Sequence, residues 1–209
     1  MSPRRATGSG AGSGEPTFTE RARREQLVAC TIELIASRGY PAASLAAIAE
    51  RAGLSKAAVL YHFGSKDKLT RAAFDHVVSR FAAYVHERVD AAPDPRAALV
   101  AYVRAMVGYQ QANRSHVRVI TETLLDDAGG TRLKTPGGHE ATGRLDGLVQ
   151  LLTAGQQAGV FREFEPRTVA LAVGGAIDGV VAAWLSDPAL DLDAAADELV
   201  AFTLRAVDA

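Results

Sequence analysis

The stretch that most constrains this chain runs from Ser44 to Phe63 and reads SLAAIAERAGLSKAAVLYHF. Ser44 and Ser55 each precede a short run of helix-forming residues. A serine hydroxyl in that position can accept a hydrogen bond from a free backbone N–H in the first turn of a helix. Gly53 lies between the two runs, where glycine adopts the left-handed conformation of a tight turn without steric cost. Two short helices joined by a glycine-containing turn of about four residues are typical of a helix-turn-helix.

The second of these helices has two unlike sides when its residues are spaced at about 100° each. We expect Val59, Leu60 and Phe63 to pack inward. The other side carries small residues first and polar or aromatic ones later, which suits a helix whose N-terminus enters the major groove of DNA. Three of the four lysines in the chain lie between positions 56 and 68, where they could contact phosphate. A plain helical hairpin is the alternative. The residues predicted to contact DNA are Ser44, Ser55, Lys56, Ala57, Ala58, Tyr61, His62 and Lys66.

The run AAIAERAGLSKAAVLYHFGSKDKL resembles the DNA-binding domain of the TetR family of bacterial transcriptional regulators, over residues 17–78. The shared pattern is an Ile-Ala pair, Ala-Gly with an aliphatic residue and Ser, an aromatic-rich end, and Ser-Lys-acid-x-Leu. The chain departs from that pattern at Ala57 and Ala58, where the family often has Gly-Thr, and at Leu60, where it often has Tyr. These changes remove two hydroxyls that could contact DNA, and leave more of the base reading to methyl contacts, Lys56 and DNA shape.

The resemblance also implies what the whole chain does. It implies a homodimer that binds a pseudo-palindromic operator in double-stranded DNA. A small-molecule effector is implied in the C-terminal bundle, and in the commonest mode of the family that ligand releases a repressor. The last two helices of each subunit are implied to build the dimer interface, and the face of Gly174, Gly175 and Gly179 fits that interface on packing grounds.

Composition and patterning predict an all-α protein of two domains. Hydrophobic residues make up 48% of the 209 residues, which favours a globular fold. Residues 1–70 hold 10 Lys and Arg against 6 Asp and Glu, whereas residues 71–209 hold 13 against 18. A polyanion is therefore expected to bind the N-terminal part. The predicted divisions are a disordered arm at 1–16, a helix-turn-helix domain at 17–64, and a ligand-binding and dimerisation domain at 65–209.

Apolar periodicity and capping residues predict about nine helices in total. The helix at 66–90 is apolar on two sides and should connect the two domains. A glycine-rich loop is predicted at 127–138. Ser65 is the expected cap of the helix at 66–90, and Asp94 that of the helix at 95–112. The other helices are expected at 19–38 with Thr19 as its cap, at 45–52, 56–63, 114–126 and 139–158, from Pro166, and after Asp193 as the cap of the last one.

The effector pocket is predicted from residue type and approximate location, because larger apolar side chains with a few polar groups line most pockets. The alternative for each candidate, a simple core or surface residue, carries more weight than a pocket role. The candidates are Tyr102, Met106, Tyr109, His116, Thr121 and Trp184.

Sequence motifs of enzymes are absent from the chain. It contains no G-x-S-x-G, P-loop, G-x-G-x-x-G or H-E-x-x-H. We therefore expect no catalytic residues, no metal and no cofactor. The N-terminus has no apolar run of the kind found in secretory signals, which favours the cytoplasm. The alternative function is a helical small-molecule carrier that has lost specific DNA binding, a hypothesis suggested by Ala57, Ala58 and Leu60.

Overall fold

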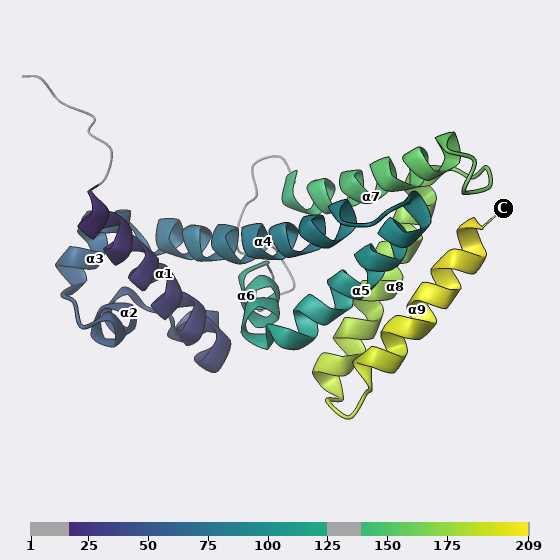
Figure 1. Cartoon of the computed structure of the whole chain (residues 1–209). Helices are drawn as coiled ribbons and strands as arrows, with labels where there is room; N and C mark the ends of the chain where they lie inside the picture. Colours follow the sequence, from purple (N-terminus) through teal and green to yellow (C-terminus); the bar gives the residue numbers. More distant parts are fainter. Residues whose placement is uncertain (1–16, 125–138, 209) are drawn as a thin grey trace, which may run out of the picture.

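The computed structural model describes residues 17–124 and 139–208, and there the predicted all-α class is confirmed. Figure 1 shows an elongated molecule, with α1, α2 and α3 at one end and a helical bundle with the C-terminus at the other. The described helices are α1 (Phe18–Arg38), α2 (Leu45–Ala52), α3 (Lys56–Phe63), α4 (Lys66–Asp90), α5 (Pro95–Ala112), α6 (Arg114–Leu124), α7 (His139–Gln157), α8 (Pro166–Ser186) and α9 (Leu192–Val207), with a short 3-10 helix η1 (Tyr40–Ala42) after α1. The predicted arm at 1–16 and loop at 127–138 lie outside the described residues.

Four helices begin at the caps that the sequence indicated. In each, the side-chain oxygen of the capping residue accepts a hydrogen bond from a backbone N–H of the first turn, which satisfies a donor that has no partner within the helix. The four capping residues are Ser44 of α2, Ser55 of α3, Ser65 of α4 and Asp94 of α5.

Two predicted caps were wrong by two residues each. Thr17, not Thr19, caps α1, because Thr17 and Glu20 form a reciprocal capping box that Thr19 cannot make. Asp191, not Asp193, caps α9, because the Asp191 carboxylate accepts from the first two N–H groups beyond Leu192. In both cases the helix starts earlier than expected, and the predicted cap lies inside its first turn.

Two hydrophobic clusters form the cores, and α4 contributes to both. Leu69, Ala73 and Val77 of α4 pack with α1, α2 and α3 in the N-terminal cluster, which also includes Val119 of α6. Val85, further along α4, packs in the C-terminal cluster with α5, α7, α8 and α9. The N-terminal core thus extends past position 64, and the boundary at 64/65 remains a prediction.

The close contact between α7 and the turn that follows it gives a stability prediction. A Cβ atom on Gly155 would lie 2.1 Å from two ring carbons of Phe161, a core residue that is only 4% exposed. Gly155→Ala should therefore lower the free energy of unfolding by about 1–3 kcal/mol, since the core must shift to accept the methyl group. Chemical denaturation at one fixed protein concentration measures the change.

Gly147→Ala is the matched control in the same helix. A Cβ at Gly147 meets nothing within 4 Å, so alanine should stabilise the helix by up to about 1 kcal/mol. Equal stability of the two variants would contradict the close packing of Phe161 on Gly155.

Candidate nucleic-acid interface

The helix-turn-helix is formed by α2 and α3 and the turn between them. Gly53 ends α2 with φ of +65°, a left-handed conformation that residues with a Cβ rarely adopt. The N–H of Leu54 then donates to the Ala49 carbonyl at 2.9 Å, and Ser55 starts α3. The turn, glycine and caps are thus those that the sequence predicted.

One side of α3 is exposed to solvent, and the other packs in the N-terminal hydrophobic cluster. Val59 is fully buried and Phe63 is 6% exposed, both in the N-terminal cluster. Leu60 was expected to pack inward with them, but it is 37% exposed. The expectation was wrong because position 60 lies at the edge of an inward side that Val59 and Phe63 already fill. The exposed side therefore carries Lys56, Ala57, Leu60 and Tyr61.

The aromatic end of α3 projects from the molecule. Tyr61 is 76% exposed, and its ring meets the ring of His62 edge-on with centroids 5.2 Å apart. His62 and Ala58 are half-buried at the borders of the exposed side. The predicted contact residues of α3 therefore form one continuous surface, with small side chains near its N-terminus and rings at its C-terminus.

The serines and lysines predicted to contact DNA differ in how accessible their polar groups are. The hydroxyls of Ser44 and Ser55 accept from Ala47 and Ala58 N–H groups at 3.1 Å, which leaves the hydroxyl proton of each for a phosphate. Lys56 is exposed. Lys66 is half-buried, with its ammonium 3.3 Å from the Tyr40 carbonyl oxygen and 4.3 Å from the centre of the Tyr40 ring. A phosphate contact by Lys66 must share the ammonium with Tyr40.

Side chains of α1 contact the ends of both helices of the motif, and our sequence analysis did not predict these contacts. The Gln26 amide donates to the Ala52 carbonyl at 3.0 Å, at the C-terminal end of α2. The Arg24 guanidinium donates to the His62 carbonyl, at the C-terminal end of α3. Only the unsatisfied carbonyls that end every helix hint at such partners from sequence.

The predicted pocket residues are only partly brought together. Tyr102, Met106 and Trp184 are each no more than 6% exposed and belong to the C-terminal cluster. Tyr109 is 5% exposed, and its ring stacks on that of Phe81 with centroids 4.5 Å apart. The other two candidates are on α6. The hydroxyl of Tyr109 and Nδ1 of His116 lie 2.7 Å apart, and burial lowers the pKa of His116. Thr121 is exposed and bonds backbone carbonyls of α6 itself.

The three glycines of α8 lie on different sides of the helix. Gly174 lies against α7, where its Cβ would be 3.6 Å from the Arg144 guanidinium. Gly175 and Gly179 are exposed, and a Cβ on either meets nothing within 4 Å. The sequence predicted that all three glycines lie in the dimer interface. Of the three, Gly175 and Gly179 have the exposure that such a contact requires.

The chemistry of the described residues offers no metal site. They contain no group of three or more His, Cys, Asp or Glu side chains that could hold a metal ion. Fold and interface together define a helix-turn-helix protein, with an exposed second helix at one end and a helical bundle at the other (Figure 1).

Comparison with known proteins agrees with this class. Residues 27–73 match the family model of bacterial regulatory proteins, tetR family. The HTH-type transcriptional regulator BetI of Burkholderia lata is 42% identical over 84 residues, 40% of this chain and 43% of that protein. BetI of Stenotrophomonas maltophilia is 39% identical over 101 residues, 48% of this chain and 52% of that protein. The chain thus spans about half the length of the curated relatives it matches.

Solved structures share the fold over nearly the whole chain. A transcriptional regulator from Saccharomonospora viridis in complex with choline has a TM-score of 0.80 at 21% identity, and covers 90% of this chain and 99% of its own. A transcriptional regulator from Rhodococcus sp. Rha1 has a TM-score of 0.74 at 25% identity, and covers 89% and 98%. The chain therefore contains an N-terminal segment of the kind found in bacterial regulatory proteins of the tetR family, as the resemblance implied, and it shares the fold of the solved regulators over nearly its whole length.

The exposed side of α3 predicts two unlike effects of substitution on DNA binding. Tyr61→Ala should weaken binding to a preferred duplex by about 1–3 kcal/mol and leave binding to unrelated duplexes nearly unchanged, if the ring contacts bases. Lys56→Ala should weaken binding to all duplexes alike and reduce the slope of log affinity against log salt by about 1. Titration of labelled duplexes at several salt concentrations measures both effects. Equal losses on preferred and unrelated duplexes for Tyr61→Ala would exclude base contact by the ring.

Proposed function

We propose that this protein is a sequence-specific DNA-binding transcriptional regulator without enzymatic activity, acting in the bacterial cytoplasm. The observation that carries the proposal is the exposed side of α3, which presents Lys56, Ala57 and Tyr61 on a helix-turn-helix of the TetR family. The N-terminus of α3 enters the major groove, where the small side chain of Ala57 allows close approach to base edges. Tyr61 and His62 then lie near the groove wall.

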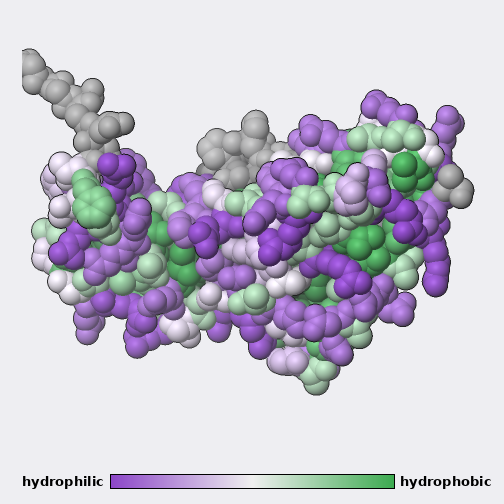
Figure 2. Space-filling model, viewed as in Figure 1, coloured by the Kyte–Doolittle hydropathy of each residue, from purple (hydrophilic) through white to green (hydrophobic). Residues whose placement is uncertain are grey.

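The proposed regulator is a homodimer joined through α8 and α9. These two helices and the turn between them expose large apolar side chains: Leu171 is 57% exposed, Phe202 54%, Leu185 37%, and Leu190 of the turn 37%. Figure 2 shows hydrophobic residues exposed among hydrophilic ones on one face of the C-terminal bundle. Large exposed apolar patches mark interaction sites. Gly175 and Gly179 add to the α8 side a flat strip that a partner helix can approach closely.

A dimer interface on α8 would account for the high hydropathy of this helix. By length and composition alone α8 could cross a membrane, with a mean hydropathy of 1.8 over its most apolar window, of which 28% is buried. Its inner side packs Val173, Ile177 and Trp184 in the C-terminal cluster. We assign its outer side to a second subunit, which would cover the apolar surface that one subunit leaves open.

The proposed effector is a small molecule bound by the C-terminal domain, and its binding releases the repressor from DNA. A groove of about 480 Å³ lies between α4 and α5. The similar structure from Saccharomonospora viridis holds choline, which makes choline the first compound to test here. The groove is lined by Tyr84, Glu87, Arg88, Ala91, Ala101, Arg104 and Ala105.

Two connections could carry a change in the C-terminal domain to the DNA-binding end. The first is α4, which packs in both cores. The second is α6, where the Glu122 carboxylate accepts from the Tyr40 N–H at 3.2 Å, beside the turn between α1 and α2. Because Tyr40 also contacts Lys66 at the start of α4, a shift of either helix changes the same junction. Release then requires that the effector bind one arrangement more tightly than the other.

Selection of duplexes from a random pool tests the proposed function directly. We expect the purified protein to enrich an inverted repeat whose half-sites lie on one face of the DNA, read by sequencing. Affinity for the enriched duplex should fall steeply with salt, because phosphate contacts release counterions. Failure to enrich any sequence at low salt would contradict the proposal and favour a small-molecule carrier.

The proposed dimer predicts the effect of charge on the α8–α9 side. Leu171→Glu combined with Phe202→Glu should raise the dimer dissociation constant at least tenfold, since burying each side chain contributes about 1.5–3 kcal/mol. Light scattering during size-exclusion chromatography measures the mass. Phe18→Glu is the control, because Phe18 is 82% exposed at the opposite end of the molecule. A dimer that persists unchanged in the double variant would place the interface elsewhere.

A further inference from the structure

The recognition helix α3 is too short to hold its own direction. It has eight residues, whereas isolated helices shorter than about 12–15 residues are marginal in water. Ser55 fixes its start, and Val59 and Phe63 anchor its inner side. The end that carries Tyr61 and His62 is also contacted by two side chains of α1.

Arg24 of α1 contacts the C-terminal end of α3 in two ways. One guanidinium N–H donates to the His62 carbonyl, and the guanidinium carbon lies 4.2 Å from the centre of the Phe63 ring. The last carbonyls of a helix have no partners within it and carry partial negative charge, which a cation stabilises. A planar guanidinium can satisfy a carbonyl and stack on a ring at the same time, which an ammonium cannot do as well.

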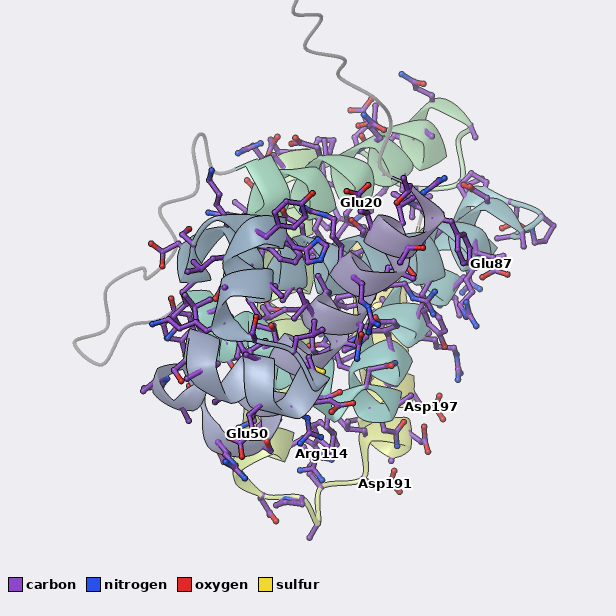
Figure 3. All side chains as sticks on the ribbon, turned by 90° about the vertical axis from the view of Figure 1, so that its left-hand side faces the viewer. Glu20, Glu50, Glu87, Arg114, Asp191 and Asp197 are labelled. Carbon is purple, nitrogen blue, oxygen red and sulfur yellow. The ribbon has the colours of Figure 1, made fainter. Side chains whose placement is uncertain are left out.

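Glu20 lies one turn earlier on the same side of α1 and approaches the neighbouring residue of α3. The Tyr61 hydroxyl is 3.4 Å from one Glu20 carboxylate oxygen, and the Thr17 N–H donates to the other at 2.8 Å. The capping box therefore holds the carboxylate that faces Tyr61. Figure 3 looks onto this end of the molecule and shows Glu20 projecting there from α1. Glu20 and Arg24 together contact Tyr61, His62 and Phe63, three consecutive residues.

We propose that Arg24 is a positioning residue of the DNA interface, which holds the end of α3 against α1 and thereby sets the direction of Tyr61 and His62. This inference rests on the proposed function, because it matters only if α3 reads DNA. Base-edge hydrogen bonds tolerate little displacement, so a small tilt of α3 costs sequence specificity before it costs attraction to phosphate. Arg24 thus contributes to specificity without touching the DNA.

The competing role for an arginine at this place is a direct phosphate contact, since Arg24 is exposed and lies at the DNA-facing end. The two roles predict different outcomes for lysine. A phosphate contact keeps its charge in Arg24→Lys, and so keeps most of its binding. The contact with the His62 carbonyl and the Phe63 ring needs the planar guanidinium, so lysine should act nearly like alanine.

The test compares Arg24→Lys and Arg24→Ala with wild type on the selected duplex and on a random duplex, across a series of salt concentrations. We expect both variants to bind the selected duplex on the order of tenfold more weakly, the random duplex within about twofold of wild type, and the salt slope to stay unchanged. Arg23→Ala is the matched control, because among the described residues Arg23 hydrogen-bonds Gln26 of its own helix, at 2.8 Å, and not α3. Wild-type binding by Arg24→Lys, or a salt slope reduced by about 1 with equal loss on both duplexes, would overturn the proposal.

Hydrogen exchange on the free protein separates this inference from the proposed function. The Gly64 N–H donates to the Leu60 carbonyl at 2.7 Å in the last turn of α3, and its exchange should accelerate in both Arg24 variants but not in Arg23→Ala. Unchanged exchange would show that Arg24 does not hold this end, whatever the DNA result. If the wild type selects no duplex while exchange responds as expected, the proposed function fails and the contact itself stands.

Discussion

A single uninterrupted helix, α4, joins the two ends of this molecule, because it packs in both hydrophobic clusters. Leu69 and Val77 lie among the helices of the helix-turn-helix end, and Val85 lies in the bundle two turns after Val77. The backbone hydrogen bonds of a helix make it stiff along its length. A displacement of the bundle end of α4 must therefore appear at its other end, where Ser65 and Lys66 adjoin the recognition helix.

The sequence predicted the local features of the fold well and the contacts between distant residues poorly. The caps by Ser44, Ser55 and Asp94 need only a side-chain oxygen and an N–H three residues away, so residue type and spacing suffice to find them. The contact between Arg24 and the His62 carbonyl spans 38 residues, and the one between Glu122 and the Tyr40 N–H spans 82. Backbone groups are the same in every residue, so no pattern of side chains reveals which of them such a partner will bond.

The candidate site shows the same division. The outward positions of Ala57 and Tyr61 follow from helical periodicity alone. Periodicity did not predict the exposure of Leu60. An apolar residue at the edge of a buried side can be covered or exposed, and which of the two occurs depends on the neighbouring helix. Lys66 looked like an exposed cation from its place at a helix start, yet Tyr40 reaches it from η1. The sequence therefore did not predict contacts between side chains that tertiary packing brings together.

The apolar outer side of α8 links stability to the proposed regulation. Glycine in a helix interior costs about 1 kcal/mol relative to alanine, and among the described residues of one subunit nothing lies within 4 Å of a Cβ at Gly175 or Gly179 to offset that cost. In the proposed dimer a partner helix would supply the missing contact. The separation of the two recognition helices would then depend on the α8–α9 interface at one end and on α4 at the other. An effector that moves α4 against a fixed interface would change that separation without having to touch the DNA-binding domain.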